Sequence, residues 1–200
     1  MLSGKDQALD VIGYERSRFL HLHSTLLTLP CFRVTHYLKP GHYAPAGYAF
    51  IMKNGERTFM YPHLPVNYTL RPPVDVDIEA IIDLIYAQDL AEVGSADRYD
   101  QDEIRKDWED LDLAQDARCI LTPEGKLAAY GTLWSYEATN FGRLYGDGYV
   151  HPDYKGRGLG ATLLDLMEIR AADFTAVHQE GTRLVLVNNI VASSASAREL

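Results

Sequence analysis

Motifs that mark several large protein classes are missing from this chain of 200 residues. Its two cysteines, Cys31 and Cys119, lie far apart in the sequence, so they predict no disulfide framework and favour a reducing compartment. No apolar run approaches the roughly 20 residues that a membrane-spanning helix needs. We therefore expect a cytoplasmic protein without a membrane partner.

Signatures of common enzyme classes are missing as well. No Gly-Lys-Ser or Gly-Lys-Thr occurs, which excludes a P-loop. Leu163 stands where the dinucleotide-binding motif needs a third glycine after Gly158-Leu159-Gly160. No G-x-S-x-G nucleophile elbow is present. His21 and His23 have no third nitrogen or sulfur ligand nearby, so we expect no metal.

Positive charge is also scarce. The chain has 19 lysines and arginines against 28 aspartates and glutamates, which gives a net charge of −9 with neutral histidines. Phosphate backbones select basic protein faces. The charge balance therefore argues against a nucleic-acid partner.

The most informative segment that is present runs from Val150 to Ala161 and reads VHPDYKGRGLGA. An apolar strand ends at Val150, a glycine-rich loop follows, and an amphipathic helix begins at Leu159. Backbone N–H groups at such a helix start, together with the helix dipole, bind anions. Lys155 and Arg157 add full positive charges where a pyrophosphate would lie.

This segment resembles the signature of the GNAT superfamily, the acyl-CoA-dependent N-acyltransferases. The family loop reads Arg/Gln-x-x-Gly-x-Gly/Ala after a strand that ends in Val-x-Pro-x-Tyr. Lys155, Gly158 and Gly160 fill the three places of the loop. A lysine in place of the usual arginine or glutamine keeps a positive charge but loses the planar fork of a guanidinium group.

The resemblance implies a fold and an activity. The fold class would be α/β (α+β), with a mixed, mostly antiparallel central sheet flanked by helices. The protein would transfer an acetyl or other acyl group from acetyl-CoA to an amine of a small molecule or peptide. The alternative is a non-catalytic acyl-CoA-binding domain, or an inactive fragment of a larger tandem acetyltransferase. The residues expected to bind acyl-CoA are Tyr149, Val150, Lys155, Gly156, Arg157, Gly158, Leu159, Gly160, Ala161 and Asn188.

Acyl transfer to an amine also benefits from a general base. Asp147 is the first candidate, because it lies on the strand that leads into the loop, and Glu137 is the second. Gly146-Asp147-Gly148 is equally consistent with a plain turn. In many GNAT enzymes a tyrosine beyond the fifth strand is the general acid, and the sequence ends before that position. Tyr145 and Tyr149 are more typical of packing aromatics.

An acidic segment precedes the loop. Between Asp75 and Asp116, fifteen carboxylates accompany three cations, Arg98, Arg105 and Lys106. A solvated helix surface is the simpler interpretation. The GNAT resemblance offers another: this region would line the acceptor side of the site, where it would attract a cationic amine.

The order of elements agrees with the resemblance. We predict strands over 68–71, 117–121, 127–135, 144–150 and 183–187. We predict helices over 76–90, 100–110 and 159–174, and the start of another over 193–200. Asp75 or Asp77 would cap the first helix. Asn188 and Asn189 would follow the fifth strand, either as turn residues or as a CoA contact.

Two domains are predicted. Residues 67–200 would form a GNAT-like acyl-CoA-binding domain, truncated in its last helix. Residues 1–66 would be an extension with a hairpin over 47–61, around Asn54-Gly55. Residues 8–19 resemble the tail of a preceding GNAT repeat, as in tandem proteins similar to mycothiol synthase. Either the chain is a fragment of a longer protein, or the N-terminal residues replace the missing cover of the sheet.

Overall fold

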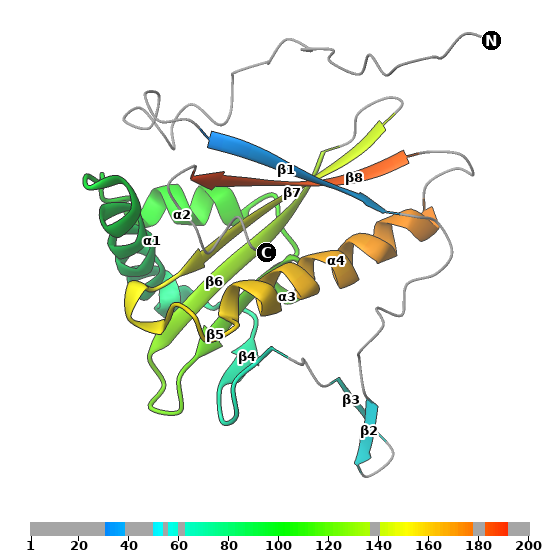
Figure 1. Cartoon of the computed structure of the whole chain (residues 1–200), viewed down its shortest axis with the longest axis horizontal. Helices are drawn as coiled ribbons and strands as arrows, with labels where there is room; N and C mark the ends of the chain where they lie inside the picture. Colours follow the sequence, from blue (N-terminus) through cyan, green and yellow to red (C-terminus); the bar gives the residue numbers. More distant parts are fainter. Residues whose placement is uncertain are drawn as a thin grey trace, which may run out of the picture.

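A six-stranded sheet organises the chain, in the strand order β1-β8-β7-β6-β5-β4 (Figure 1). The computed structural model describes residues 31–38, 50–53, 56–59, 63–136, 141–177 and 183–191. Neighbouring strands are antiparallel except for β7 and β8, which are parallel. The predicted mixed, mostly antiparallel sheet is thus confirmed. Its strands are β1 (Cys31–Leu38), β4 (Thr69–Arg71), β5 (Ala117–Leu121), β6 (Leu127–Tyr136), β7 (Phe141–Val150) and β8 (Arg183–Val191).

Helices cover both faces of this sheet. On one face lie α1 (Ile78–Val93) and α2 (Gln101–Trp108), and α4 (Leu159–Val177) lies on the other (Figure 1). The short helix α3 (Leu113–Asp116) precedes β5, and 3-10 turns form at η3 (Asp75–Asp77) and η4 (Pro152–Tyr154). The sheet therefore has two separate hydrophobic cores, one on each face.

The first core lies between the sheet and α1–α2. Isoleucines at helical spacing place the apolar face of α1 on the strands. Trp108 of α2 reaches into the same core and its indole Nε1 donates a hydrogen bond to the Tyr130 hydroxyl, at 2.9 Å. The buried members are Ile78, Ile81, Ile82, Leu84, Ile85, Ile104, Trp108, Ala117, Cys119 and Tyr130.

The second core lies under α4. Leu159, Leu163, Met167 and Ala171 are spaced four residues apart, so they share the helix face that packs on the sheet. Glycines on the strands bring the helix close: a Cβ atom at Gly131 would lie 3.0 Å from the Met167 Cε atom. A side chain at Gly131 would therefore push α4 away from the sheet.

Several predicted elements are close to the observed ones, and some differ. The strand predicted over 183–187 continues to Val191, so the expectation that Asn188 and Asn189 follow it is wrong. The strand is longer because it pairs with β1 along its whole far end. Asp77 is the N-cap of α1, but its side chain makes no cap hydrogen bond there. Its carboxylate instead accepts from Arg71 and from the Val74 amide.

The N-terminal third contributes strands of its own. The predicted hairpin is confirmed as the antiparallel pair β2 (Phe50–Lys53) and β3 (Glu56–Phe59). β1 was not predicted, and it pairs antiparallel with β8 at the edge of the main sheet. β1 thus covers the edge of β8 that faces away from β7. The predictions for residues 8–19, His21, His23, Glu137 and 193–200 lie outside the described residues.

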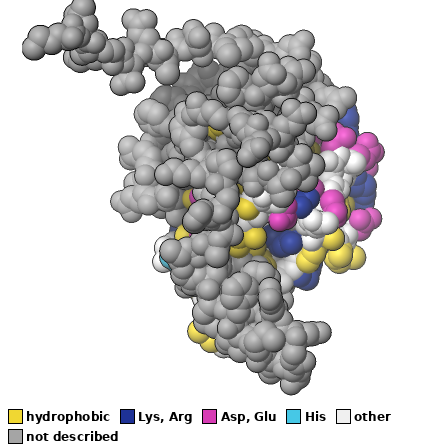
Figure 2. Space-filling model, turned by 90° about the vertical axis from the view of Figure 1, so that its right-hand side faces the viewer, with side chains coloured by type: hydrophobic (Ala, Val, Ile, Leu, Met, Phe, Trp, Pro, Cys, Tyr) yellow, Lys and Arg dark blue, Asp and Glu magenta, His cyan; other side chains and the backbone are white. Residues whose placement is uncertain are grey.

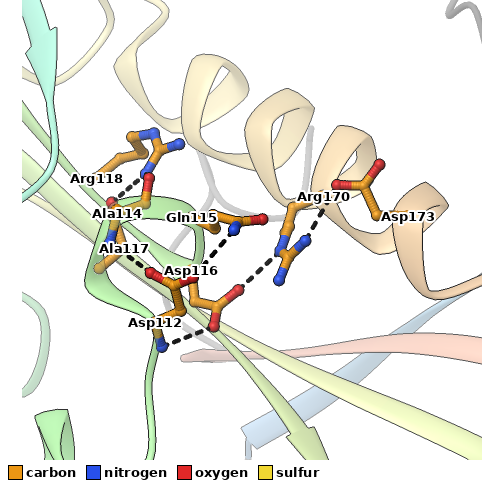
Figure 3. A network of polar contacts seen from close by, with 8 residues as sticks. All are labelled: Asp112, Ala114, Gln115, Asp116, Ala117, Arg118, Arg170 and Asp173. Carbon is orange, nitrogen blue, oxygen red and sulfur yellow. Dashed lines mark hydrogen bonds and ion pairs between the residues drawn. The ribbon is translucent and has the colours of Figure 1, made fainter.

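Polar contacts tie α3 to α4 (Figure 3). The Asp112 carboxylate accepts from the Ala114 amide at 3.1 Å, which caps α3. The Arg170 Nε atom of α4 donates to Asp116 at 2.8 Å, and its Nη1 atom donates to Asp173 at 3.1 Å.

Beside this network lies a cavity of about 140 Å³, bordered by β6 and α4. On the described part of the face shown in Figure 2, acidic and basic side chains lie interspersed.

Candidate active site

The two parallel strands β7 and β8 pair along only part of their length. Their last paired residues are Gly146 and Asn188, after which β7 runs on to Val150 and β8 to Val191. A Cβ atom at Gly146 would collide with the Asn188 Oδ1 atom and lie 2.7 Å from the Met167 Sδ atom, so both side chains would have to shift. The buried Asn188 Nδ2 atom has no hydrogen-bond partner among the described residues. A donor without a described partner therefore lies where the strands part.

The free edge of β7 faces this opening. Val150 stands opposite Ala129 of β6, and the next amide, that of His151, donates to the Ala128 carbonyl at 2.9 Å. Val150 thus occupies a non-hydrogen-bonded position of the antiparallel ladder, so its N–H and C=O point away from β6. The Val150 N–H instead donates to the side-chain oxygen of Gln88, which comes from α1.

The glycine loop connects β7 to α4 through η4. Gly156 and Gly158 have φ angles of +75° and +80°, a left-handed conformation that glycine adopts without steric penalty. A Cβ atom at Gly158 would also lie 2.6 Å from the His63 carbonyl oxygen. The Gly158 carbonyl accepts from the amide and the hydroxyl of Thr162, at 2.9 Å and 3.0 Å. The loop therefore ends in a rigid helix start whose first N–H groups have no partner within the helix.

The two cations of the loop are held by neighbouring elements. The Lys155 Nζ atom lies 2.7 Å from the Glu92 carboxylate near the end of α1. Arg157 donates to the Tyr68 hydroxyl at 3.2 Å, and its guanidinium group lies over the Tyr154 ring, 5.2 Å from the centroid. Both side chains remain beside the helix start, where they add positive charge.

Three half-buried carboxylates gather on the α1–α2 face. Burial raises the pKa of Asp147 to about 6, and the neighbouring Asp107 carboxylate adds to the effect. Burial likewise raises the pKa of Asp107 to about 6, with Glu103 contributing, and that of Asp89 to about 6, with Glu92 contributing. Within the described part of the chain, Asp147 has no hydrogen bond or ion pair. It therefore remains available to a substrate proton.

Tyrosines surround these carboxylates. Burial raises the pKa of Tyr99, Tyr130 and Tyr149, and the Asp147 charge raises each further. Their hydroxyl groups therefore keep their protons at neutral pH. Tyr149 also packs against the α1–α2 core, as expected for a packing aromatic.

The fold thus brings the predicted site residues to one end of β7. The loop residues, Val150, Asn188 and Asp147 all lie around the opening between the strands. Sequence reasoning did not single out Gln88 or Glu92, nor the carboxylates of Asp89 and Asp107. The only sequence signal was the density of carboxylates between 75 and 116, which does not say which of them face the sheet.

Comparison with known proteins identifies the class. The chain belongs to the acetyltransferase (GNAT) family, whose profile matches residues 80–192. A GCN5-related N-acetyltransferase from Sphaerobacter thermophilus is 34% identical, with a TM-score of 0.61, over 68% of this chain. The match spans 42% of that protein's length. No curated protein matches the sequence.

A second solved structure agrees in fold. The yncA protein from Salmonella typhimurium, solved with its cofactor acetyl-CoA, is 21% identical, with a TM-score of 0.52. The match covers 66% of this chain and 75% of that one. At this identity the likeness concerns the fold alone. Neither relative bears on the expected tandem arrangement.

Two further observations concern what the described residues lack. None of the helices placed by the structure is both long enough and apolar enough to cross a bilayer. Among the same described residues, no three His, Cys, Asp or Glu side chains come together in a way that would hold a metal ion.

Proposed function

We propose that this chain is an N-acyltransferase that moves an acetyl group from acetyl-CoA to an amine. The site would lie within the predicted domain 67–200, at the opening between β7 and β8. The observation that carries the proposal is the parting of these strands directly beside a glycine loop that ends in a helix N-terminus. The acetyl-CoA in the solved yncA structure supports the choice of cosubstrate.

Acetyl-CoA would be held by main-chain and charged groups. The N–H groups from Gly156 to Ala161 would receive the pyrophosphate, assisted by Lys155 and Arg157. The free edge of β7 at Tyr149 and Val150 would hydrogen-bond the pantetheine arm. The Asn188 side-chain amide, whose Nδ2 atom has no partner in the described part of the chain, would donate to the same ligand. Main-chain N–H groups on this edge would also stabilise the developing oxyanion.

Asp147 would serve as the general base. An alkylammonium group has a pKa near 10.4, so about 4 to 5 kcal/mol is needed to deprotonate it at pH 7. With a pKa raised to about 6, the Asp147 carboxylate is mostly ionised at pH 7 yet basic enough to accept a proton. Its place on β7, on the face covered by α1 and α2, supports this role.

The acceptor would be a cationic amine. Asp107 of α2 neighbours Asp147, and Asp89 of α1, like Asp147, raises the pKa of Tyr99 and Tyr149. Neither Asp89 nor Asp107 makes a hydrogen bond or ion pair with another described residue. A substrate with a second positive charge would compensate these carboxylates. The tyrosines around them would border the same space. This proposal names a class of acceptor and not a compound.

The proposal is tested first by a thermal melt with and without acetyl-CoA. Ligand at about 100 times its Kd adds roughly 2.7 kcal/mol of stability. For a chain of this size the midpoint should rise by about 5 to 10 °C. A cooperative melt that acetyl-CoA does not shift would remove the proposal.

Turnover then distinguishes an enzyme from a non-catalytic acyl-CoA-binding domain. Asp147→Asn should lower kcat at least ~100-fold and leave the Kd for acetyl-CoA unchanged. In the wild type, kcat/KM should rise with pH and level off above about 6, because the base must be ionised. Asp89→Asn is the matched control and should raise KM for the amine more than it lowers kcat. An Asp147→Asn enzyme with full turnover would exclude this base.

A further inference from the structure

Two side chains of α1 contact the acyl-CoA site from outside the glycine loop. Gln88 and Glu92 lie four residues apart, so they share one face of the helix. Gln88 accepts from the Val150 N–H, at the end of β7. Glu92, whose side chain is 11% exposed, pairs with Lys155 at the start of the loop. The same helix face therefore engages a strand donor and a loop cation together.

The Val150 N–H has one proton to donate. It points away from β6, because the neighbouring His151 amide already pairs with Ala128 across that ladder. β8 does not accept it either, because the strands part after Gly146 and Asn188. The side-chain oxygen of Gln88 is the acceptor that it has in this structure. A side-chain amide carbonyl and a pantetheine amide carbonyl are the same chemical group.

We infer that Gln88 is an internal substitute for the amide carbonyl of acyl-CoA, held on the free edge of β7 until the cosubstrate replaces it. This inference rests on the proposed function. Binding would exchange the Gln88 hydrogen bond for one from the ligand, and the Glu92–Lys155 pair for a contact with phosphate. Both exchanges return α1 side chains to solvent. Gln88 is thus a positioning residue that sets the affinity for acyl-CoA without touching the acceptor.

Replacing Gln88 should therefore tighten binding. In Gln88→Leu the Val150 N–H has no partner in the free protein, and acyl-CoA no longer has to displace one. The Kd for CoA, measured by calorimetric titration, should fall about two- to tenfold. Gln88→Leu should melt below the wild type without ligand and show a larger upward shift with it. If Gln88 had only a structural role, Gln88→Leu would lower the melting temperature by the same amount with and without CoA.

Two control variants test whether the side-chain oxygen of Gln88 is the group that CoA displaces. Gln88→Glu keeps an acceptor oxygen next to the Val150 N–H, so CoA should bind no more tightly than to the wild type. Gln101→Ala removes a glutamine whose side-chain bonds go to Glu79 and Arg105 on the α1–α2 surface, so it should leave the Kd unchanged. If Gln88→Leu does not fold, Gln88→Ala removes the same acceptor with a smaller side chain, and the Kd for CoA should fall in the same way.

The Glu92–Lys155 ion pair allows an independent test of the same inference. Glu92→Gln should release Lys155 and tighten CoA binding, with a steeper loss of affinity as salt is added. Glu79→Gln removes the same charge from the same helix, where Glu79 pairs with Arg98, and serves as the control. Equal effects of the two variants would mean that only net charge matters.

The outcomes separate the two levels of inference. If the wild type binds neither CoA nor acetyl-CoA, the proposed function fails and the role of Gln88 with it. If the wild type binds CoA, and removing the acceptor by Gln88→Leu, or by Gln88→Ala where Gln88→Leu does not fold, leaves the Kd for CoA unchanged or higher, the proposed function stands and the role of Gln88 is overturned.

Discussion

Two glycines of the loop share a backbone conformation but not their surroundings. Gly156 and Gly158 have φ angles of +75° and +80°. A Cβ atom at Gly156 would meet nothing within 4 Å, whereas one at Gly158 would lie 2.6 Å from the His63 carbonyl oxygen. The backbone of His63 therefore packs closely against Gly158 and not against Gly156.

This difference predicts unequal effects of the same substitution. Gly156→Ala should destabilise the protein by about 1 to 2 kcal/mol, the cost of a left-handed alanine. Gly158→Ala should cost more, about 2 to 4 kcal/mol, because backbone must also move. Denaturant unfolding of both variants checks the order. Equal losses would mean that His63 yields without strain.

Some individual residues of the candidate site could be predicted from the sequence. The loop residues were found because glycines, a strand end and a helix start follow one another along the chain. Asp147 was found because it lies three residues before that strand ends. Gln88 and Glu92 could not be found, since their partners Val150 and Lys155 lie more than sixty positions away. Only the packing of α1 on the sheet brings them together.

Among the helices, α2 has a capping box at its N-terminus. The Asp100 carboxylate accepts from the Glu103 amide, and the Glu103 carboxylate accepts from the Asp100 amide, each at 2.9 Å. This capping box satisfies two N–H groups at the start of an eight-residue helix. The helix presents Asp107 and Trp108 to the α1–α2 face.

Removing the cap should therefore loosen α2. Asp100→Ala should cost about 1 kcal/mol of stability, because the Glu103 amide loses its acceptor. Asp102→Ala is the matched control: this side chain is 92% exposed and pairs with Arg105 on the surface, so it should cost a few tenths of a kcal/mol. Hydrogen exchange of the first-turn amides of α2 would measure both. Equal protection in the two variants would contradict the role of the cap.

Local signals predicted most elements and missed those that depend on distant partners. The strand over Ala117–Leu121 was predicted with its observed bounds, because a turn and apolar residues delimit it locally. The extension of β8 to Val191 was missed, because residues 188–191 are held by β1 rather than by their own pattern. β1 itself was missed for the same reason. α3 was missed because it spans four residues, which is too short for a periodic pattern.

For the whole molecule, the edge of the sheet depends on β1. This strand pairs with β8 from Cys31 opposite Val191 to Leu38 opposite Leu184. In the strand order it is the outermost member, so its other edge pairs with no described strand. Successive amides of a strand point to opposite edges. Of two neighbouring residues, one donates to β8 and the other does not.

Proline substitutions at neighbouring positions exploit this alternation. We expect one of Val34→Pro and Thr35→Pro to cost about 3 kcal/mol, because it removes a ladder hydrogen bond. The other should cost much less, because proline is tolerated where an edge strand faces outward. Each variant is the control for the other in thermal unfolding. Two mild effects would mean that β1 contributes little to the fold.

The pairing of β1 with β8 has a consequence for synthesis. Residue 31 is synthesised 160 positions before its partner at residue 191. Contacts between such distant positions form late, because a long loop must close first. Until β8 has been made, β1 cannot form this pairing, and an unpaired strand is exposed to aggregation. The nascent chain must therefore keep β1 apart from other chains until β8 has left the ribosome.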